Sequence, residues 1–293
     1  MDNFIVLYNP LAGNGTAQDK MRELESLMQG DRLYFSNMLD IRDYGAFFNA
    51  MPDGASIIIC GGDGTLNRFL NDTEDIRPDC DIYSYPSGSG NDFARDIGAE
   101  RGAPPVLINR YIERLPKICV NGKEHRFING IGYGIDGYCC EKGDELRGKG
   151  NGEVNYTAIA IKGLLFHYKP TGATITVDGV EHRFEKVWLA PTMVGRYYGG
   201  GMMPTPEQDR LNGDGAVSVT VYYGSGKLKS LAVFPSIFKG EHIKHSEMVA
   251  VLSGRNITVC FDEPRPLQID GETVPGVREY SVTACEEKVL QPA

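Results

Sequence analysis

The sequence predicts a chain of two parts, an open α/β domain followed by a mainly antiparallel β domain. At roughly 100–200 residues per domain, its 293 residues are enough for two. The first third alternates short apolar runs with segments that carry apolar residues at helical spacing, as in an α/β sheet. From about Lys117 the pattern changes to strand-like runs ended by Asn-Gly or Asp-Gly, which is typical of hairpins. We therefore predict domains at 1–115 and 116–293, and we allow the extreme C-terminus to return to the first domain.

The elements of the first domain follow in order from apolar spacing. We expect strands at 4–9, 55–60 and 81–85 and helices at 16–28 and 65–70. The run at 55–60 is rich in isoleucine, as is typical of a parallel strand that is buried on both faces.

The second domain reads as a series of strands and turns. We expect its strands at 117–120, 174–177, 187–190, 217–223, 256–261 and 280–283. One helix, expected over 155–168, interrupts them and is predicted to lie against the sheet.

Composition and charge exclude several classes of protein. The apolar share of 41% and the charged share of 24% indicate a folded globular chain. A net charge of −9 argues against nucleic acid as a partner. Seven cysteines without CxxC spacing indicate neither a disulfide framework nor a thiolate zinc site. The start has no signal-peptide pattern and no apolar run reaches membrane-span length, so we expect a cytoplasmic protein whose membrane contact is peripheral at most.

The strongest local signal is the segment GGDGTLN at 61–67, which directly follows the predicted strand 55–60. Glycines between a buried strand and a helix let backbone N–H groups close on a phosphate without a Cβ in the way. Asp63 adds a carboxylate that a merely structural turn does not need. The segment therefore predicts a phosphate-binding loop, with a plain glycine turn as the alternative.

Two further glycine loops follow predicted strands, at 9–15 and at 86–95. In an open α/β sheet such loops gather at the carboxyl ends of the strands, where ligands bind. Three of them together predict a nucleotide site.

Six motifs then occur in order between Asn9 and Glu272, namely NPLAGNG, GGDGTLN, PSGSGNDFAR, NGIGYGIDG, GRYYGGGMMPTPEQDRLNGDG and QIDGE. In this order they resemble the diacylglycerol kinase catalytic family of lipid kinases, which also includes sphingosine and ceramide kinases. The soluble bacterial members are most similar. The resemblance implies a nucleotide-binding α/β domain followed by a β-sandwich-like domain, with the active site in the cleft between them.

The resemblance also implies which residues bind ATP. ATP is expected on the first two glycine loops and on Ser89, where the family often has threonine. The implied nucleotide-binding residues are Asn9, Gly61, Gly62, Asp63, Gly64, Thr65, Asn67 and Ser89.

The segment LNGDGA at 211–216 is similar to the structural magnesium site of the family. The family uses an aspartate and two main-chain carbonyls there, which implies Leu211, Asp214 and Ala216 as ligands. Oxygen ligands suit a hard cation. Without the resemblance, the same residues would form a plain hairpin turn, and the two interpretations are compatible.

The QIDGE motif supplies the catalytic carboxylates that the resemblance implies. In the family the glutamate is the favoured proton acceptor for the lipid hydroxyl, so we assign Glu272 as the general base and Asp270 as its alternative. Asp63 completes the candidate catalytic set. On its own, the Asp-Gly pair would be read as a surface turn.

Two positions depart from the family pattern. The family usually has glutamate after GGDGT-x-N and glycine after the helix, where this chain has Arg68 and Asp72. Neither change removes a glycine of the phosphate loop.

Three functions compete at this point. The leading hypothesis is an ATP- and Mg²⁺-dependent kinase that phosphorylates a hydroxyl of diacylglycerol or a related lipid. NAD kinase shares the GGDG loop and the two-domain plan. A nucleotide-binding module without turnover is the third, with Arg68 as a mark of decay. The expected partners are ATP and a lipid, with a homodimer left open.

The segment 226–239 offers a way to reach a lipid surface. Three lysines, Lys227, Lys229 and Lys239, flank leucine, valine and phenylalanine side chains, although the whole chain is acidic. We expect the segment either to touch an anionic membrane or to form an ordinary amphipathic helix that packs on the β domain.

Overall fold

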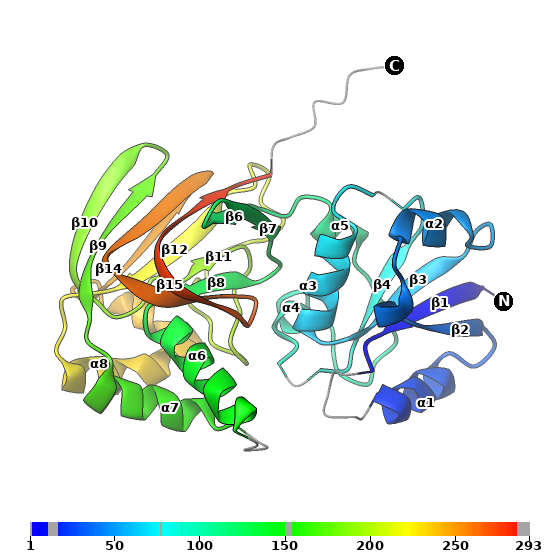
Figure 1. Cartoon of the computed structure of the whole chain (residues 1–293), viewed down its shortest axis with the longest axis horizontal. Coiled ribbons are helices and arrows are strands. Elements are labelled where there is room, and N and C mark those ends of the chain that lie inside the picture. Colours follow the sequence, from blue (N-terminus) through cyan, green and yellow to red (C-terminus); the bar gives the residue numbers. More distant parts are fainter. Residues whose placement is uncertain (1, 11–16, 77, 89, 150–153, 286–293) are drawn as a thin grey trace. The chain divides into compact units, whose positions relative to one another are not determined.

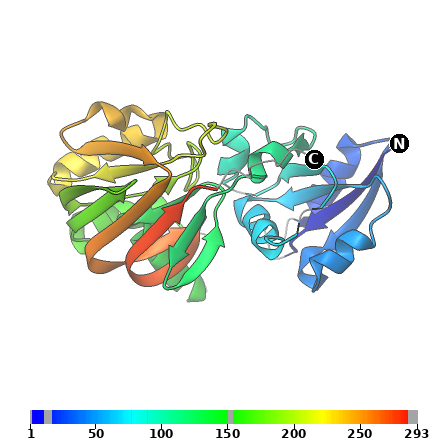
Figure 2. The ribbon, with the colours of Figure 1, turned by 90° about the horizontal axis from the view of Figure 1, so that it is seen from above.

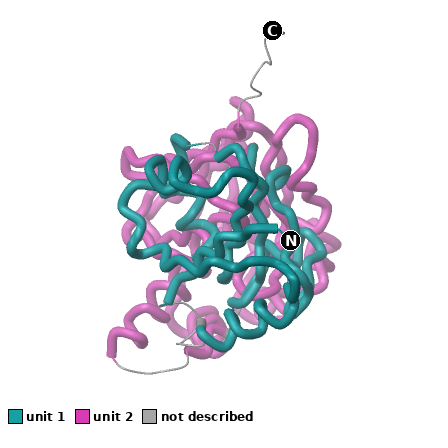
Figure 3. Tube along the Cα trace, turned by 90° about the vertical axis from the view of Figure 1, so that its right-hand side faces the viewer, with its two compact units in different colours: residues 1–113 teal, residues 114–293 magenta. Residues whose placement is uncertain are grey.

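The structure is a computed structural model of the chain, and it describes residues 2–10, 17–76, 78–88, 90–149 and 154–285. The chain divides into two compact units, Met1–Glu113 and Arg114–Ala293 (Figure 3). The boundary lies two residues before the position 115 that the sequence predicts. The extreme C-terminus, which we allowed to return to the first domain, lies largely outside the described residues.

Unit 1 is built on a sheet whose described strands run in the order β2-β1-β3-β4-β5 (Figure 1). The strands are β1 (Asn3–Tyr8), β2 (Arg32–Asn37), β3 (Ser56–Gly61), β4 (Ile82–Pro86) and β5 (Val106–Leu107). The first four are mutually parallel, and β5 is antiparallel to β4. Tyr8 is in register with Cys60, and Gly61 with Pro86, so the chain leaves β1, β3 and β4 at one edge of the sheet.

The helices of unit 1, apart from the four-residue helix α5, bury apolar side chains in the core of the unit. They are α1 (Ala17–Leu27), α2 (Tyr44–Asn49), α3 (Asp63–Asp72), α4 (Asp92–Asp96), α5 (Asn109–Ile112) and the 3₁₀ helix η2 (Met38–Asp40). In α3 the buried residues Leu66, Phe69 and Leu70 are spaced three and four apart, which places them on one helical face. This packing fixes the start of α3, which carries the predicted phosphate loop.

Unit 2 is antiparallel throughout its described strand pairs, and ten strands form one hydrogen-bonded set there. They are β6 (Lys117–Val120), β7 (Lys123–Arg126), β8 (Gly130–Tyr133), β9 (Thr171–Val177), β10 (Val180–Val187), β11 (Thr192–Met193), β12 (Val217–Tyr222), β13 (Val249–Gly254), β14 (Asn256–Ile269) and β15 (Glu272–Thr283). The first half of β14 pairs with β9 and its second half with β8. Figure 2 shows the strands of this unit strongly curved around a common interior, in which residues such as Phe261 and Val219 are fully buried. These observations confirm the predicted α/β domain followed by an antiparallel β domain.

Three hairpins of unit 2 turn through two-residue loops at Asn121-Gly122, Asp178-Gly179 and Asp270-Gly271. The first residue of each has a positive φ, between 45° and 51°. Asparagine and aspartate tolerate this left-handed conformation better than other non-glycine residues, and glycine follows in each case. The turn chemistry therefore fixes the register of these hairpins.

Helical segments of unit 2 differ from the sequence-based expectation. Helix α6 (Ile135–Gly148) was not expected, and the helix expected over 155–168 is α7 (Tyr156–Lys162) followed by the π-helical turn η3 (Gly163–His167). The basic segment forms α8 (Lys227–Val233), the 3₁₀ helix η4 (Phe234–Lys239) follows it, and η5 (Glu241–Lys244) comes next. None of the described helices has the length and apolar character of a membrane-spanning helix.

The strand expected at 187–190 is wrong. Strand β10 ends at Val187, and Leu189 instead makes isolated bridges to Gly134 and Tyr222. The backbone of Leu189 thus connects the start of α6 with β12, so its apolar neighbours are buried without forming a regular strand.

Candidate active site

The predicted nucleotide loops begin at the shared edge of the unit 1 sheet. The strand order 2-1-3 reverses direction between β1 and β3, and ligands of open α/β sheets bind at such a switch point. Asn9 directly follows Tyr8 at the end of β1, and Gly61 directly follows Cys60, which pairs with Tyr8. The rest of the first glycine loop, 11–16, lies outside the described residues.

The second and third glycine loops contact each other through their backbones. A Cβ on Gly62 would lie 2.9 Å from the Cα of Gly88, and one on Gly61 would overlap the side chain of Thr65. The Ser87 N–H donates to the Gly61 carbonyl at 3.0 Å. A Cβ on Gly64, in contrast, would meet no atom within 4 Å among the described residues. Glycine at 61, 62 and 88 is therefore required by packing, and Gly64 is the position that leaves open space for a ligand.

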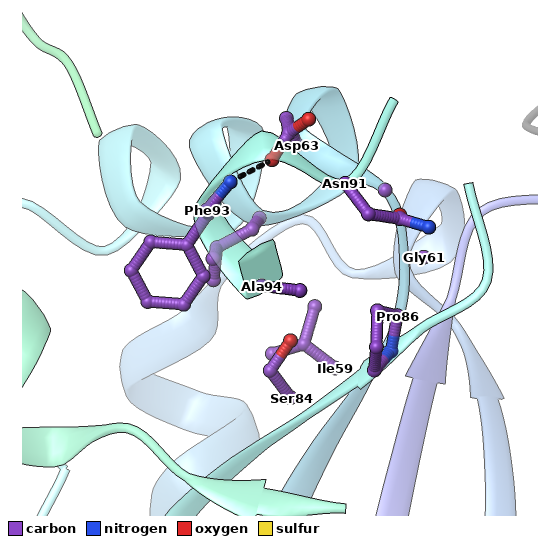
Figure 4. A pocket seen from close by; sticks show the side chains of 10 residues that line it. Ile59, Gly61, Asp63, Ser84, Pro86, Asn91, Phe93 and Ala94 are labelled. Atoms are coloured by element: carbon purple, nitrogen blue, oxygen red, sulfur yellow. Dashed lines mark hydrogen bonds between the residues drawn. The ribbon is translucent and has the colours of Figure 1, made fainter. Parts of the chain in front are cut away.

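Asp63 joins the two loops with its carboxylate (Figure 4). Its Oδ2 accepts from the Asp92 N–H at 2.9 Å, and its Oδ1 accepts from the Phe93 N–H at 3.0 Å, which caps the start of α4. Asn91, in the left-handed conformation, bonds Gly88 through both atoms of its amide. The pocket between the loops is only about 10 Å³, room for one water at most. A nucleotide would therefore bind over the loops and not between them.

The other predicted nucleotide residues of α3 are partly engaged within the unit. Thr65 is 4% exposed and packs under Gly61, so its side chain faces inward. Asn67 Oδ1 accepts from the side-chain amide of Asn71 at 3.2 Å. Ser89 lies outside the described residues.

The two departures from the family pattern form an ion pair with each other. Arg68 Nε lies 3.3 Å from Asp72 Oδ2, one helical turn along α3, and both side chains are about half exposed. The aspartate thus compensates the arginine, and the charge reversal faces solvent on the outer side of the helix.

The hairpin between β14 and β15 separates the two carboxylates of the QIDGE motif. Asp270 accepts three backbone N–H groups, from Ile128 at 2.7 Å, Asn129 at 2.9 Å and Gly130 at 3.0 Å. Glu272 is exposed, and its side chain makes no hydrogen bond or ion pair with any described residue. Asp270 therefore holds the loop before β8, whereas the Glu272 carboxylate is available to a substrate.

The predicted metal loop at 211–216 is a hydrogen-bonded turn. The Ala216 carbonyl accepts from Gln208 Nε2 at 2.8 Å and from Asn212 Nδ2 at 2.7 Å, which fills its acceptor capacity. Asp214 is exposed, and its Oδ1 accepts from the Ala216 N–H at 3.2 Å. Asn212 Oδ1 is buried without a hydrogen-bond partner in the described part of the chain.

Sequence reasoning missed a buried pair between two motifs. Asp136, in NGIGYGIDG, accepts a short hydrogen bond from the hydroxyl of Tyr198, in GRYYGGGM. Burial raises the pKa of the Asp136 carboxyl to about 6, against the hydrogen bond from Tyr198, which lowers it. Each motif carries one polar member of the pair, but nothing local in the sequence indicates that the two meet.

Two family descriptions match the chain in sequence order. The diacylglycerol kinase catalytic domain matches residues 3–117. The YegS C-terminal NAD kinase beta sandwich-like domain matches residues 129–286, which is more than half of the chain.

Individual relatives are similar over most of the chain. The diacylglycerol kinase of Mycobacterium tuberculosis is 27% identical over 246 residues, which cover 81% of this chain and 77% of that protein. The diacylglycerol kinase of Bacillus subtilis is 28% identical over 224 residues, which cover 74% and 70%. A solved structure of a diacylglycerol kinase from Bacillus anthracis has a TM-score of 0.59 at 18% identity, covers 97% of this chain and 94% of that chain, and shows the same fold. The chain therefore belongs to the diacylglycerol kinase catalytic family of lipid kinases.

Proposed function

We propose that the protein transfers the γ-phosphate of ATP to a hydroxyl group of diacylglycerol or a related lipid. The observation that carries the proposal is that the two carboxylates of the β14–β15 hairpin have different surroundings. Asp270 is used by three backbone N–H groups, while the neighbouring Glu272 is exposed and has no side-chain partner among the described residues. A carboxylate with this freedom can orient an acceptor hydroxyl and take its proton.

In this proposal ATP lies over the glycine loops of unit 1. The phosphates take backbone N–H groups at the start of α3, where the helix dipole favours negative charge and Gly64 leaves room. Asn9 and Ser89 complete the predicted nucleotide site, and the side chain of Thr65 supports it from below. Asp63 keeps the third glycine loop in place through α4.

The proposed reaction needs little covalent chemistry from the protein. The lipid oxygen attacks the γ-phosphorus, the bond from that phosphorus to the bridging oxygen of ADP breaks, and the hydroxyl proton passes to a carboxylate oxygen of Glu272. Asp270 orients the hairpin that carries Glu272 and keeps its own oxygens on the backbone of 128–130. Magnesium, when bound with ATP, supplies neutralisation of the phosphate charge.

The donor set at 211–216 fits a structural cation in part. The exposed carboxylate of Asp214 and the orphaned buried oxygen of Asn212 are oxygen ligands of the kind that magnesium takes. Leu211 and Ala216 would add their carbonyls, and Ala216 would first have to release one of its two amide donors. We propose Asp214 as the ligand on which this site depends.

The proposal includes peripheral contact with an anionic membrane through α8 and η3. Lys227 Nζ donates to the Leu165 carbonyl at 2.8 Å, which holds these two elements side by side. Leu228 on α8 is 79% exposed and Phe166 on η3 is 72% exposed. Lys229 pairs with Glu247 at 2.8 Å, so Lys227 and Lys239 contribute most of the uncompensated charge. Large exposed apolar side chains beside lysines are the composition of a membrane-facing surface.

Vesicle co-sedimentation tests the membrane contact. Leu228→Ser should reduce binding to vesicles that contain anionic lipid. The double variant Lys227→Gln and Lys239→Gln should reduce this binding further when it is measured at low salt. Val180→Ser is the matched control, because Val180 is 59% exposed and belongs to β10, not to α8 or η3. Equal sedimentation of all three proteins and the wild type would remove the membrane contact from the proposal.

Incubation of the pure protein with labelled ATP, Mg²⁺ and separate acceptors tests the reaction. We expect label in diacylglycerol or a related lipid and none in NAD. Label in NAD would favour the NAD kinase alternative, which the description of the C-terminal family also names. ATP binding without label in any acceptor would favour a module without turnover. A cytoplasmic location and a homodimer stay predictions.

A further inference from the structure

The residue after Glu272 connects the catalytic hairpin to helix α6. Thr273 Oγ1 donates to Asp144 Oδ2 at 2.7 Å, across 129 positions of sequence. The other oxygen of that carboxylate, Oδ1, accepts from Arg147 Nη2 at 2.6 Å, one turn along α6. Asp144 is thus oriented by its own helix and presents one oxygen to the hairpin.

Helix α6 is held closely against the strand that precedes this hairpin. A Cβ on Gly137 would overlap the carbonyl of Pro266 in β14, so the helix backbone contacts the strand backbone directly. At the other end of α6, a Cβ on Gly143 would lie 2.7 Å from the ring of Tyr156 in α7. A helix packed this tightly on two sides offers a fixed point for Asp144.

The tip of the hairpin needs such a fixed point. Ile269 pairs with Glu272 and Leu267 with Val274, but the pairing of β15 becomes irregular at Pro275 and Gly276, with Gly276 at φ 64°. The register of β14 and β15 shifts at the same place, between Arg265 and Leu267. The short segment that carries Glu272 is therefore separated from the regular part of β15.

We propose that Asp144 is a positioning residue that sets the direction of the Glu272 side chain through Thr273. Neighbouring side chains of a strand point to opposite faces. A hydrogen bond that holds Thr273 toward α6 therefore directs Glu272 to the other face of the hairpin. Gln268 Oε1, which accepts from the Gly271 N–H at 2.6 Å, fixes the turn, whereas the hydrogen bond from Thr273 to Asp144 holds the start of β15 to α6. The inference rests on the proposed role of Glu272.

Steady-state kinetics and thermal unfolding of single variants test this role. Thr273→Val removes the donor and keeps the shape of the side chain, so we expect kcat to fall about tenfold with the KM for ATP and the Tm unchanged. Thr273→Ser keeps the hydroxyl and should keep wild-type kcat. Asp144→Ala should lower kcat as Thr273→Val does, and the double variant should be no worse than either single variant, because both remove one bond.

The same helix provides a matched control. Lys142 and Glu145 form an ion pair at 2.6 Å with the spacing of Asp144 and Arg147, and neither contacts the hairpin through a hydrogen bond in the described residues. Glu145→Ala should leave kcat unchanged. A fall in kcat as large as that of Asp144→Ala would mean that α6 stability, and not the bond to Thr273, is responsible.

Kinetics of Thr273→Val combined with Glu272→Gln separate this inference from the proposed function. If Asp144 acts through Glu272, Thr273→Val should not lower the residual kcat of Glu272→Gln any further. Full activity of Glu272→Gln would overturn the proposed base itself. An inactive Glu272→Gln together with a fully active Thr273→Val would leave the base in place and overturn the positioning role.

Discussion

The glycine loops of unit 1 and the β14–β15 hairpin of unit 2 are stabilised by the same kind of hydrogen bond in different surroundings. In each, an aspartate gives its carboxylate to backbone N–H groups, Asp63 to the start of α4 and Asp270 to the residues before β8. Around Asp63 the backbones of Gly62 and Gly88 are in direct contact, whereas around Glu272 the anchors are side chains. The contact between Gly62 and Gly88 should therefore tolerate almost no added atom, and the hairpin should respond to substitution in graded steps.

The largest effect is expected at Glu272, the proposed base. Glu272→Gln should lower kcat about 10²–10⁴-fold and leave the KM for ATP and the Tm unchanged, because the exposed side chain supports no described contact. Single-turnover measurements with saturating ATP check this. Wild-type turnover would show that the hairpin has no part in the chemistry.

The contact between glycine loops gives the next largest effect. Gly62→Ala puts a Cβ 2.9 Å from the Gly88 Cα, so we expect loss of activity together with a loss of about 1–3 kcal/mol in the free energy of unfolding. Gly64→Ala is the control, since its Cβ has open space among the described residues. It should raise the KM for ATP without changing stability. If Gly62→Ala and Gly64→Ala lose the same free energy of unfolding, the distinction between packed and open glycines is wrong.

Asp270 provides the direct comparison with Glu272. Asp270→Asn leaves one oxygen for three N–H donors, so we expect activity and stability to fall together, with about 1–3 kcal/mol lost in urea unfolding. A variant that loses activity but keeps full stability would reverse the assignment and make Asp270 the base.

Stability should depend on pH through Asp136. The pKa of its carboxyl is about 6 in the folded protein against an ordinary value of 3.8, so the folded state binds more protons between these values. Its contribution is fully present below pH 4 and is lost as the pH rises through 6. Relative to Asp136→Asn, the wild type should therefore lose up to about 3 kcal/mol of stability between pH 4 and pH 7. Parallel stability profiles of the two proteins would contradict the raised pKa.

The smallest effect is expected at the metal loop. Mg²⁺ in excess over EDTA should raise the Tm of the wild type by a few degrees, because a ligand that binds only the folded state stabilises it. Asp214→Ala should abolish this rise with little change in the Tm measured in EDTA. An equal rise in both proteins would place the stabilising ion elsewhere.

Local signals predicted the elements near the sites well. Asn121-Gly122 and Asp178-Gly179 turn as their sequence indicates, and the run at 55–60 forms the buried strand that leads into the glycine loop. Such features depend on two to six neighbouring residues, so a sequence window contains their cause.

Contacts between distant residues could not be predicted in this way. Helix α6 contains Gly137 and Gly143, which lower helix propensity, and only Pro266 and Tyr156 explain why they are needed. Asp63 finds its partners about 30 positions away and Asp270 about 140 positions away. Sequence reasoning therefore predicts both carboxylates as catalytic. In the structure, each of them accepts hydrogen bonds from backbone N–H groups.

Strand β14 has a consequence for how unit 2 unfolds. One strand hydrogen-bonds to β9 through its first half, to β8 through its second half and to β15 along both. If β14 detaches, three partners lose their hydrogen bonds at once, so the two halves of the sheet cannot melt in separate steps. The amides of β14 should exchange with deuterium only through opening of the entire unit, which makes this strand the reporter of its cooperativity.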